Sequence, residues 1–265
     1  MKNICIPLLT ALAFFIGAIF NHAEILFFPP NDWPDEDWTV SSVGGTPIVE
    51  SVTLQGKTWL QIARADSPNT GSAQVMYNGI DAQLSDITGS VIFGIDTIST
   101  YGSGVILRSQ STAISQTSAY YLAVTPNVSG SAKLELYWGV GNGFLSGGTL
   151  LASETLSISL GTLDATHNNQ YLLEFSFIGN KLDASLSNWD TVNEQKGIDL
   201  ASLSYTDERL EARSEGYFGV RGGRYGSEVA TYFRDLEITA IPEPASTAFL
   251  LLPAGYLLLH FGRKP

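Results

Sequence analysis

The sequence predicts an all-β fold: an antiparallel β-sandwich of the jelly-roll kind, flanked by an N-terminal signal helix and a C-terminal transmembrane helix. Three observations carry this prediction. From Ser90 onward, short apolar runs alternate with turns rich in Gly, Ser and Asn. Charged residues make up only 15% and aromatic residues 11%, which favours an extracellular β protein over a helical cytosolic enzyme. Both ends of the chain are apolar segments of the kind that direct export.

Residues 1–23 have the three-part layout of a secretory signal peptide. Lys2 gives a basic start, and an apolar stretch covers Ile4–Phe20. Ala23 is a small residue before the expected cut at Glu24, so we expect export by the general secretion machinery and cleavage by signal peptidase. An uncleaved anchor helix is the alternative. The only cysteine, Cys5, precedes most of the apolar run, which does not fit a lipoprotein site, and the mature domain would contain no disulfide.

A second apolar run, residues 245–262, lies close to the end of the chain. As a helix, these 18 residues would be about 27 Å long, just enough to cross the hydrocarbon core of a membrane. Arg263 and Lys264 follow the run and would stay cytoplasmic. The large domain is therefore expected on the outer side of that membrane.

The tail also carries a specific motif, Pro242-Glu243-Pro244, ahead of the apolar run. Together with Ser246 and the basic pair, it resembles the PEP-CTERM sorting signal. The resemblance implies that an exosortase, a membrane transpeptidase-like enzyme, processes the protein near this motif. It also implies that the protein comes from a Gram-negative bacterium that makes exopolysaccharide. The protein would first be a membrane-anchored intermediate and would then pass to the cell surface or extracellular matrix. A plain anchor helix is the alternative, and only the sorting interpretation predicts processing.

Residues 24–240 are expected to form one large domain, because about 217 residues can bury a sizeable core. Gly179-Asn180 offers the left-handed backbone of a two-residue hairpin turn, and Gly56 is a turn candidate between short strands at Val52–Leu54 and Trp59–Ala63. No long amphipathic helix is expected. The other predicted strands are Val91–Ile98, Gly104–Ser109, Tyr120–Thr125, Lys133–Trp138, Thr149–Leu156, Tyr171–Ile178, Lys181–Leu186, Gly216–Arg221 and Val229–Ile238.

The order of these runs from Ser90 to Thr239 resembles that of concanavalin-like, laminin-G-type jelly rolls. Its parts include Gly104–Arg108, Tyr120–Val124 and the hairpin Leu173–Leu186. The resemblance implies a domain that binds glycans on a concave sheet face, although some members are glycosidases and others are purely structural.

Five side chains are the candidates for such a glycan site. By alternation they lie opposite the core-facing residues of their strands, on an exposed sheet face, whereas Trp138 is assigned to the core. Rings, guanidinium groups and carboxylates suit a sugar site, and they also suit an ordinary solvated face. The candidates are Arg108, Tyr121, Glu135, Tyr137 and Arg221.

No catalytic constellation is expected. The single domain histidine, His167, lies in a loop, and no Gly-x-Ser-x-Gly elbow or Glu-x-Asp-x-x-Glu strand occurs. The acidic residues at 207–211 are interpreted as a solvated turn, and those at Asp35–Asp37 as a solvated loop, with calcium as the alternative for the latter. No metal or cofactor is expected. A net charge of −12 argues against nucleic-acid binding.

We therefore expect an exported, envelope-sorted bacterial surface or extracellular-matrix protein. Its jelly-roll domain would be non-catalytic and would bind polysaccharide if it has a ligand. A secreted carbohydrate-active enzyme of the glycoside-hydrolase kind, or a purely structural matrix component, are the alternatives.

Overall fold

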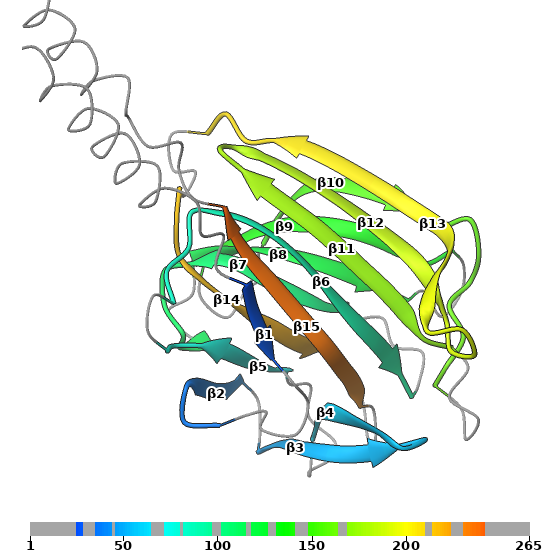
Figure 1. The fold of residues 1–265 in the computed structure, drawn as a ribbon. Helices are drawn as coiled ribbons and strands as arrows, with labels where there is room; N and C mark the ends of the chain where they lie inside the picture. Colours follow the sequence, from blue (N-terminus) through cyan, green and yellow to red (C-terminus); the bar gives the residue numbers. More distant parts are fainter. Residues whose placement is uncertain are drawn as a thin grey trace, which may run out of the picture. The chain divides into compact units, whose positions relative to one another are not determined.

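Strands joined by turns form two antiparallel sheets that pack face to face (Figure 1). The predicted all-β sandwich is thereby confirmed. The structure is a computed structural model, which describes residues 25–28, 35–43, 46–64, 72–79, 82–96, 102–114, 118–126, 131–140, 148–163, 169–209, 214–223 and 230–241. Within these ranges no helix has the length and apolar character needed to cross a membrane.

One sheet has eight strands, in the order β13-β12-β11-β6-β15-β4-β3, with β1 paired to β15. Strands that are far apart in the sequence are neighbours here, because β15 near the C-terminal end lies between β6 and β4. The bounds are β1 Ile25–Phe28, β3 Pro47–Leu54, β4 Lys57–Arg64, β6 Asp86–Ile95, β11 Tyr171–Ile178, β12 Lys181–Asp190, β13 Gln195–Thr206 and β15 Thr231–Ile241.

The other sheet has seven strands, in the order β10-β9-β8-β7-β14-β5-β2. The bounds are β2 Trp38–Val43, β5 Ser72–Tyr77, β7 Ser103–Ser109, β8 Ser118–Thr125, β9 Lys133–Val140, β10 Thr149–Thr155 and β14 Tyr217–Gly223. The chain thus passes repeatedly from one sheet to the other, which is the connectivity of a jelly roll.

Apolar side chains on the inner faces of the sheets form the main core. On β11, Leu173, Phe175 and Phe177 alternate with more exposed residues, as the period-two pattern predicts. Leu136 and Trp138 on β9 belong to the same cluster, which confirms the assignment of Trp138 to the core. Each fully buried side chain of this size contributes roughly 1.5–3 kcal/mol relative to an exposed one.

Both predicted hairpin turns are present. Ile178 pairs with Lys181, so Gly179 and Asn180 alone form the loop between β11 and β12, and Gly179 has a φ of 57°. Leu54 pairs with Lys57 in the same way across Gly56, whose φ is 71°. Left-handed backbone at these positions suits glycine and matches the twist of the strands.

The sequence does not predict β1, β2, β5 or β13, and the burial patterns of the last two explain why. Five of the six residues of β5 are buried, and one of them is Gln74, a polar residue that interrupts the apolar run. The first five residues of β13 are exposed at the sheet edge and include polar and charged side chains. The second half of β13 does alternate, with Ala201 and Leu203 buried and Ser202 and Ser204 exposed, but this signal was missed.

Ile25–Ala240 form one compact unit. The predicted leader, with its cut between Ala23 and Glu24, lies outside the described residues. The sorting motif Pro242-Glu243-Pro244 and the basic pair Arg263 and Lys264 also lie outside them, so both end segments remain predictions.

Candidate functional site

The outer face of the seven-stranded sheet carries four of the five predicted glycan-binding residues. Tyr121 on β8 pairs directly with Tyr137 on β9, and Glu135 lies two residues before Tyr137. Tyr121 packs with Met76 and Ile106 in a cluster separate from the main core. Alternation therefore predicted the correct face for these four residues. The prediction that they are exposed is wrong for three of them.

Tyr121 and Arg221 are buried, with exposed fractions of 0% and 1%. Tyr121 Oη donates a hydrogen bond to the carbonyl of Gly102 at 2.6 Å, and Arg221 Nη2 donates to Ser72 Oγ at 2.6 Å. Arg221 Cζ lies 5.6 Å from the centre of the Tyr121 ring. Burial is the main cause that raises the pKa of Tyr121 and lowers the pKa of Arg221. A substitution at Tyr121 would therefore change the stability of the fold before it changed any binding. The prediction failed because strand alternation gives the face on which a residue lies but not whether other residues cover that face.

Arg108 is the exception, since it lies between the two sheets. Its φ of 49° is left-handed, and the pairing of β7 with β14 shifts by one residue there, so the strand bulges and the alternation reverses. The guanidinium Cζ lies 3.7 Å from the centre of the core ring of Phe177. Arg108 also donates to the carbonyls of Ser85, at 2.8 and 3.0 Å, and of Gly179, at 2.6 Å. The prediction that Arg108 belongs to an exposed face is wrong.

Tyr137 is the partly accessible member of the predicted set. Its hydroxyl donates to Glu135 Oε2 at 2.9 Å, and the same oxygen accepts from Thr125 Oγ1 at 2.7 Å. Burial, followed by the hydrogen bond to Glu135, raises the pKa of Tyr137, so its hydroxyl stays protonated. Glu135 itself is buried, with 6% exposed. The pair offers a ring beside an oriented carboxylate, which suits contact with a sugar.

Asp207 corrects the interpretation of residues 207–211 as a solvated turn. Its carboxylate is 2% exposed and accepts from Tyr120 Oη at 2.6 Å and from Arg209 Nε at 2.8 Å. Arg209 Cζ in turn lies 4.7 Å from the ring centre of Trp138. Burial alone would raise the pKa of Asp207, but these hydrogen bonds outweigh it and bring the pKa to about 2. Asp207 is a structural anchor, whereas the neighbouring Glu208 is exposed.

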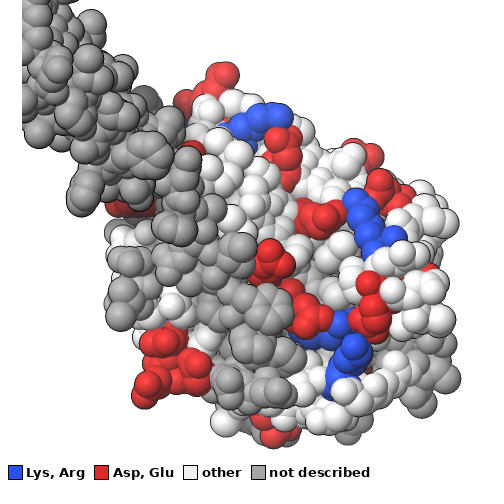
Figure 2. Space-filling model, viewed as in Figure 1, with Lys and Arg blue, Asp and Glu red and all other residues white. Residues whose placement is uncertain are grey.

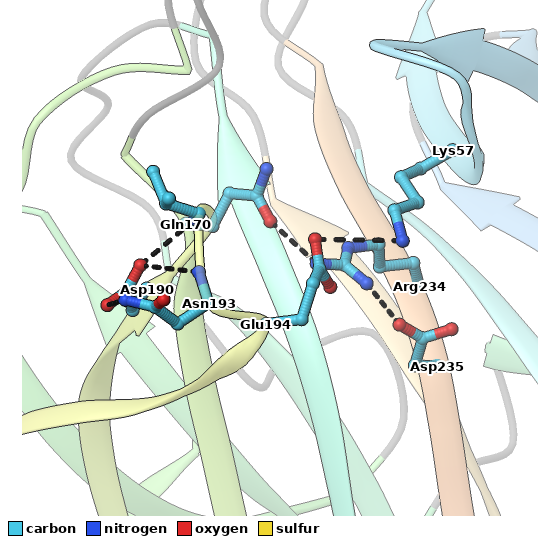
Figure 3. A network of polar contacts seen from close by, with 8 residues as sticks. Lys57, Gln170, Asp190, Asn193, Glu194, Arg234 and Asp235 are labelled. Carbon is cyan, nitrogen blue, oxygen red and sulfur yellow. Dashed lines mark hydrogen bonds and ion pairs between the residues drawn. The ribbon is translucent and has the colours of Figure 1, made fainter.

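A cluster of polar and aromatic side chains on the outer face of the eight-stranded sheet was not predicted. Arg234 Cζ lies close to two indoles, 5.2 Å from the ring centre of Trp59 and 5.6 Å from that of Trp189. Its Nη2 donates to Gln170 Oε1 at 3.0 Å and to Glu194 Oε2 at 3.3 Å, and its Nη1 to Asp235 (Figure 3). We call this the Arg234 cluster, comprising Trp59, Gln170, Trp189, Glu194 and Arg234.

The turn between β12 and β13, residues 191–194, brings Glu194 to this cluster. Asp190 Oδ1 accepts from the backbone N–H groups of Val192 and Asn193 at 2.9 and 3.0 Å, and Asn193 Nδ2 donates to Oδ2 at 2.8 Å (Figure 3). Glu194 has a left-handed φ of 50° and also pairs with Lys57 at 3.6 Å. The charges of Arg234 and Lys57 are thus matched by those of Glu194 and Asp235.

The outward direction of two side chains in this cluster could be predicted from the sequence. Trp59 precedes the core residue Leu60, and Arg234 follows the core residue Phe233, so alternation directs both outward. Trp59 and Arg234 come into contact because β4 lies beside β15, and no local sequence pattern predicts this pairing.

Charge on the described surface is mixed. Figure 2 shows acidic and basic side chains interspersed over the part of the described face in view. Asp35, Glu36 and Asp37 are exposed, and Asp35 Oδ1 accepts from the backbone N–H of Asp37 at 2.9 Å. Among the described residues no three His, Cys, Asp or Glu side chains group as metal ligands. His167 lies outside those residues.

Comparison with solved structures shows a lectin-like fold. The chain is similar to a legume lectin-like domain from Entamoeba histolytica, with 13% identity, a TM-score of 0.54, and coverage of 84% of this chain and 100% of that one. It is also similar to the exoplasmic/lumenal domain of VIP36 bound to Ca²⁺ and Man3GlcNAc, with 12% identity, a TM-score of 0.54, and coverage of 84% and 92%. For lectin I from Ulex europaeus, in complex with the methyl glycoside of α-L-fucose, the identity is 14%, the TM-score 0.51, and the coverage 82% and 98%.

The fold is therefore a jelly-roll sandwich of the legume-lectin, concanavalin-like type, which confirms the predicted class. No protein-family profile matches the sequence, and no curated protein does.

Proposed function

We propose that this chain is an exported, envelope-sorted bacterial surface or matrix protein whose sandwich is a non-catalytic glycan-binding domain. The observation that carries the binding proposal is the two-sheet lectin-like fold over more than four fifths of the chain. Fold alone does not fix function, so the proposal also depends on Tyr137 and Glu135, which place a ring beside a carboxylate on the outer face of the seven-stranded sheet.

The export and sorting proposals rest on the sequence of the two ends. Signal peptidase would cut near Glu24, and an exosortase would process the tail near Pro242-Glu243-Pro244. Under this proposal, the polysaccharide of the host's own envelope is the first ligand to test.

The binding proposal is tested by affinity electrophoresis of the full-length chain in gels that contain the host's exopolysaccharide. Wild type should be retarded. Tyr137→Ala should weaken the retardation about tenfold or less, because one aromatic contact is worth about 1 kcal/mol. Glu135→Gln should also weaken binding, since it removes the charge that orients the Tyr137 hydroxyl.

The matched control is Glu174→Gln, the same change on the outer face of the other sheet, where the carboxylate pairs with Lys196. This variant should be retarded like wild type. A wild-type chain that migrates freely in every polysaccharide tested would favour a purely structural matrix component, and hydrolysis of the gel polysaccharide would favour a secreted carbohydrate-active enzyme.

A further inference from the structure

The Arg234 cluster contains three buried N–H donors without an acceptor among the described residues. They are Nε1 of Trp59, Nε1 of Trp189 and Nε of Arg234. Trp59 and Arg234 are only 1% and 2% exposed, so bulk water does not serve these donors. Buried donors are nearly always paired in native proteins, because each unpaired one is costly. Three in one cluster therefore point to a missing acceptor.

Charge balance indicates that the acceptor is neutral. Arg234 and Lys57 carry two positive charges, and Glu194 and Asp235 carry two negative ones, so the cluster has no net charge to attract an anion. The chain as a whole has a net charge of −12, which disfavours anions further. Two of the three donors are neutral indoles. A hydroxyl oxygen can accept from such groups without bringing a charge into the cluster.

The indoles also suit the rest of a sugar ring. Trp189 is partly exposed on β12, so its ring can stack against the apolar face of a sugar while its N–H meets a hydroxyl. We propose that the Arg234 cluster is a second, closed glycan site that takes a neutral sugar residue. This inference rests on the proposed function for its ligand class, but it uses different residues on the opposite face of the sandwich.

Access to the site depends on Glu194. The donor atoms are covered in the closed form, and Glu194 at the end of the turn 191–194 contacts Arg234, so we infer that this turn moves when a sugar enters. Glu194 holds the turn to Arg234 at 3.3 Å and to Lys57 at 3.6 Å, and both distances exceed those of a strong charge-assisted hydrogen bond. Glu194 is also 39% exposed, so water competes for its carboxylate. Opening would leave Arg234 paired with Gln170 and Asp235.

The test follows the indole N–H signals of the ¹⁵N-labelled full-length chain by NMR, in a zwitterionic detergent without a sugar headgroup. The probes are the methyl glycosides of glucose, mannose and galactose, N-acetylglucosamine, and glucuronate as the anionic comparison. Trp59→Phe and Trp189→Phe assign the two signals. We expect both signals to shift saturably with at least one neutral sugar and less with glucuronate.

Two variants separate the roles of donor and gate. Trp189→Phe keeps an aromatic ring but removes the N–H, so binding should weaken about three- to tenfold. Glu194→Gln keeps the shape of the gate but removes its charge, so binding should strengthen by a similar factor, because the closed form is less favoured. Glu174→Gln, on the same sheet and outside the cluster, should leave binding unchanged.

The outcomes are distinguishable from those of the proposed function. Indole signals that stay fixed in every sugar, and show contacts to bound water instead, would overturn this inference even if the gels detect polysaccharide binding through Tyr137. Shifts of both indole signals would support it even if Tyr137→Ala binds like wild type. Tighter binding by the Glu174→Gln control would overturn the role given to Glu194.

Discussion

Asp207 makes the clearest prediction at the scale of a single residue. Its pKa is about 2 in the folded protein, against about 3.9 in an unfolded chain. A carboxyl group with a lowered pKa stabilises the fold while it is ionised. The contribution of Asp207 is therefore complete above about pH 4 and is lost as the pH falls toward 2.

We expect Asp207→Asn to lower the free energy of unfolding at pH 7 by about 1.5–3 kcal/mol, because the hydrogen bonds from Tyr120 and Arg209 lose their charged acceptor. Urea unfolding of residues 24–240 between pH 7 and 2 measures this. Wild type should lose about 2 kcal/mol more than the variant between pH 4 and 2. If the free energy of unfolding depended on pH in the same way for wild type and Asp207→Asn, the role given to Asp207 would be contradicted.

For single residues, the sequence predicted the sheet face on which a side chain lies better than it predicted whether that side chain is buried. It placed Tyr121 and Tyr137 on one face, but the burial of Tyr121 depends on tertiary packing that period two does not report. Arg108 was misplaced because it lies in a β-bulge, where the alternation of the strand breaks. Trp59 and Arg234 could not be paired without knowing that β4 and β15 are neighbours.

The hairpin turn between β11 and β12 is the element whose chemistry is simplest to test. Gly179 has a φ of 57°, and a Cβ built on it meets nothing within 4 Å. Any cost of a side chain there is therefore backbone strain rather than a clash.

We expect Gly179→Ala to lower the free energy of unfolding by about 1–2 kcal/mol, measured by urea unfolding of residues 24–240. Gly179→Asn should cost less, because asparagine tolerates left-handed backbone better than alanine does. Equal stability of the two variants would mean that the strand pairing, and not the turn, fixes this hairpin.

The sequence predicted strands with one buried face and strands with two, because β7 and β8 are continuous apolar runs bounded by turns although almost all of their residues are buried. β9, β11 and β12 alternate cleanly and appear where expected. β5 was missed because the buried Gln74 interrupts its short apolar run, and β13 because its first five residues are exposed at an edge and include polar and charged side chains. The order of the strands in each sheet was not predicted, since pairing partners lie far apart in the sequence.

On the scale of the whole molecule, we predict that the C-terminal tail determines membrane insertion and processing. Replacing Pro242-Glu243-Pro244 by three alanines leaves the apolar run at 245–262 intact, so membrane insertion should persist while processing stops. Western blots of membrane and medium fractions from the native host should then show the full-length form accumulating in the membrane. A host strain without its exosortase is the control and should give the same pattern. An unchanged size and location of the variant would reduce the tail to a plain anchor.

The polar contacts that join the two sheets have a mechanical consequence. Arg108 on β7 bonds to the carbonyls of Ser85 and Gly179, and Tyr120 on β8 bonds to Asp207 beyond the end of β13. The hydrophobic effect itself has no direction, whereas these hydrogen bonds do, so they add to the resistance to sliding that interdigitated side chains already give. These directional bonds pin the stagger of one sheet on the other. If the domain is held by a membrane at one end and by a polymer on its surface, as proposed, these bonds would reduce shear between its layers under tension.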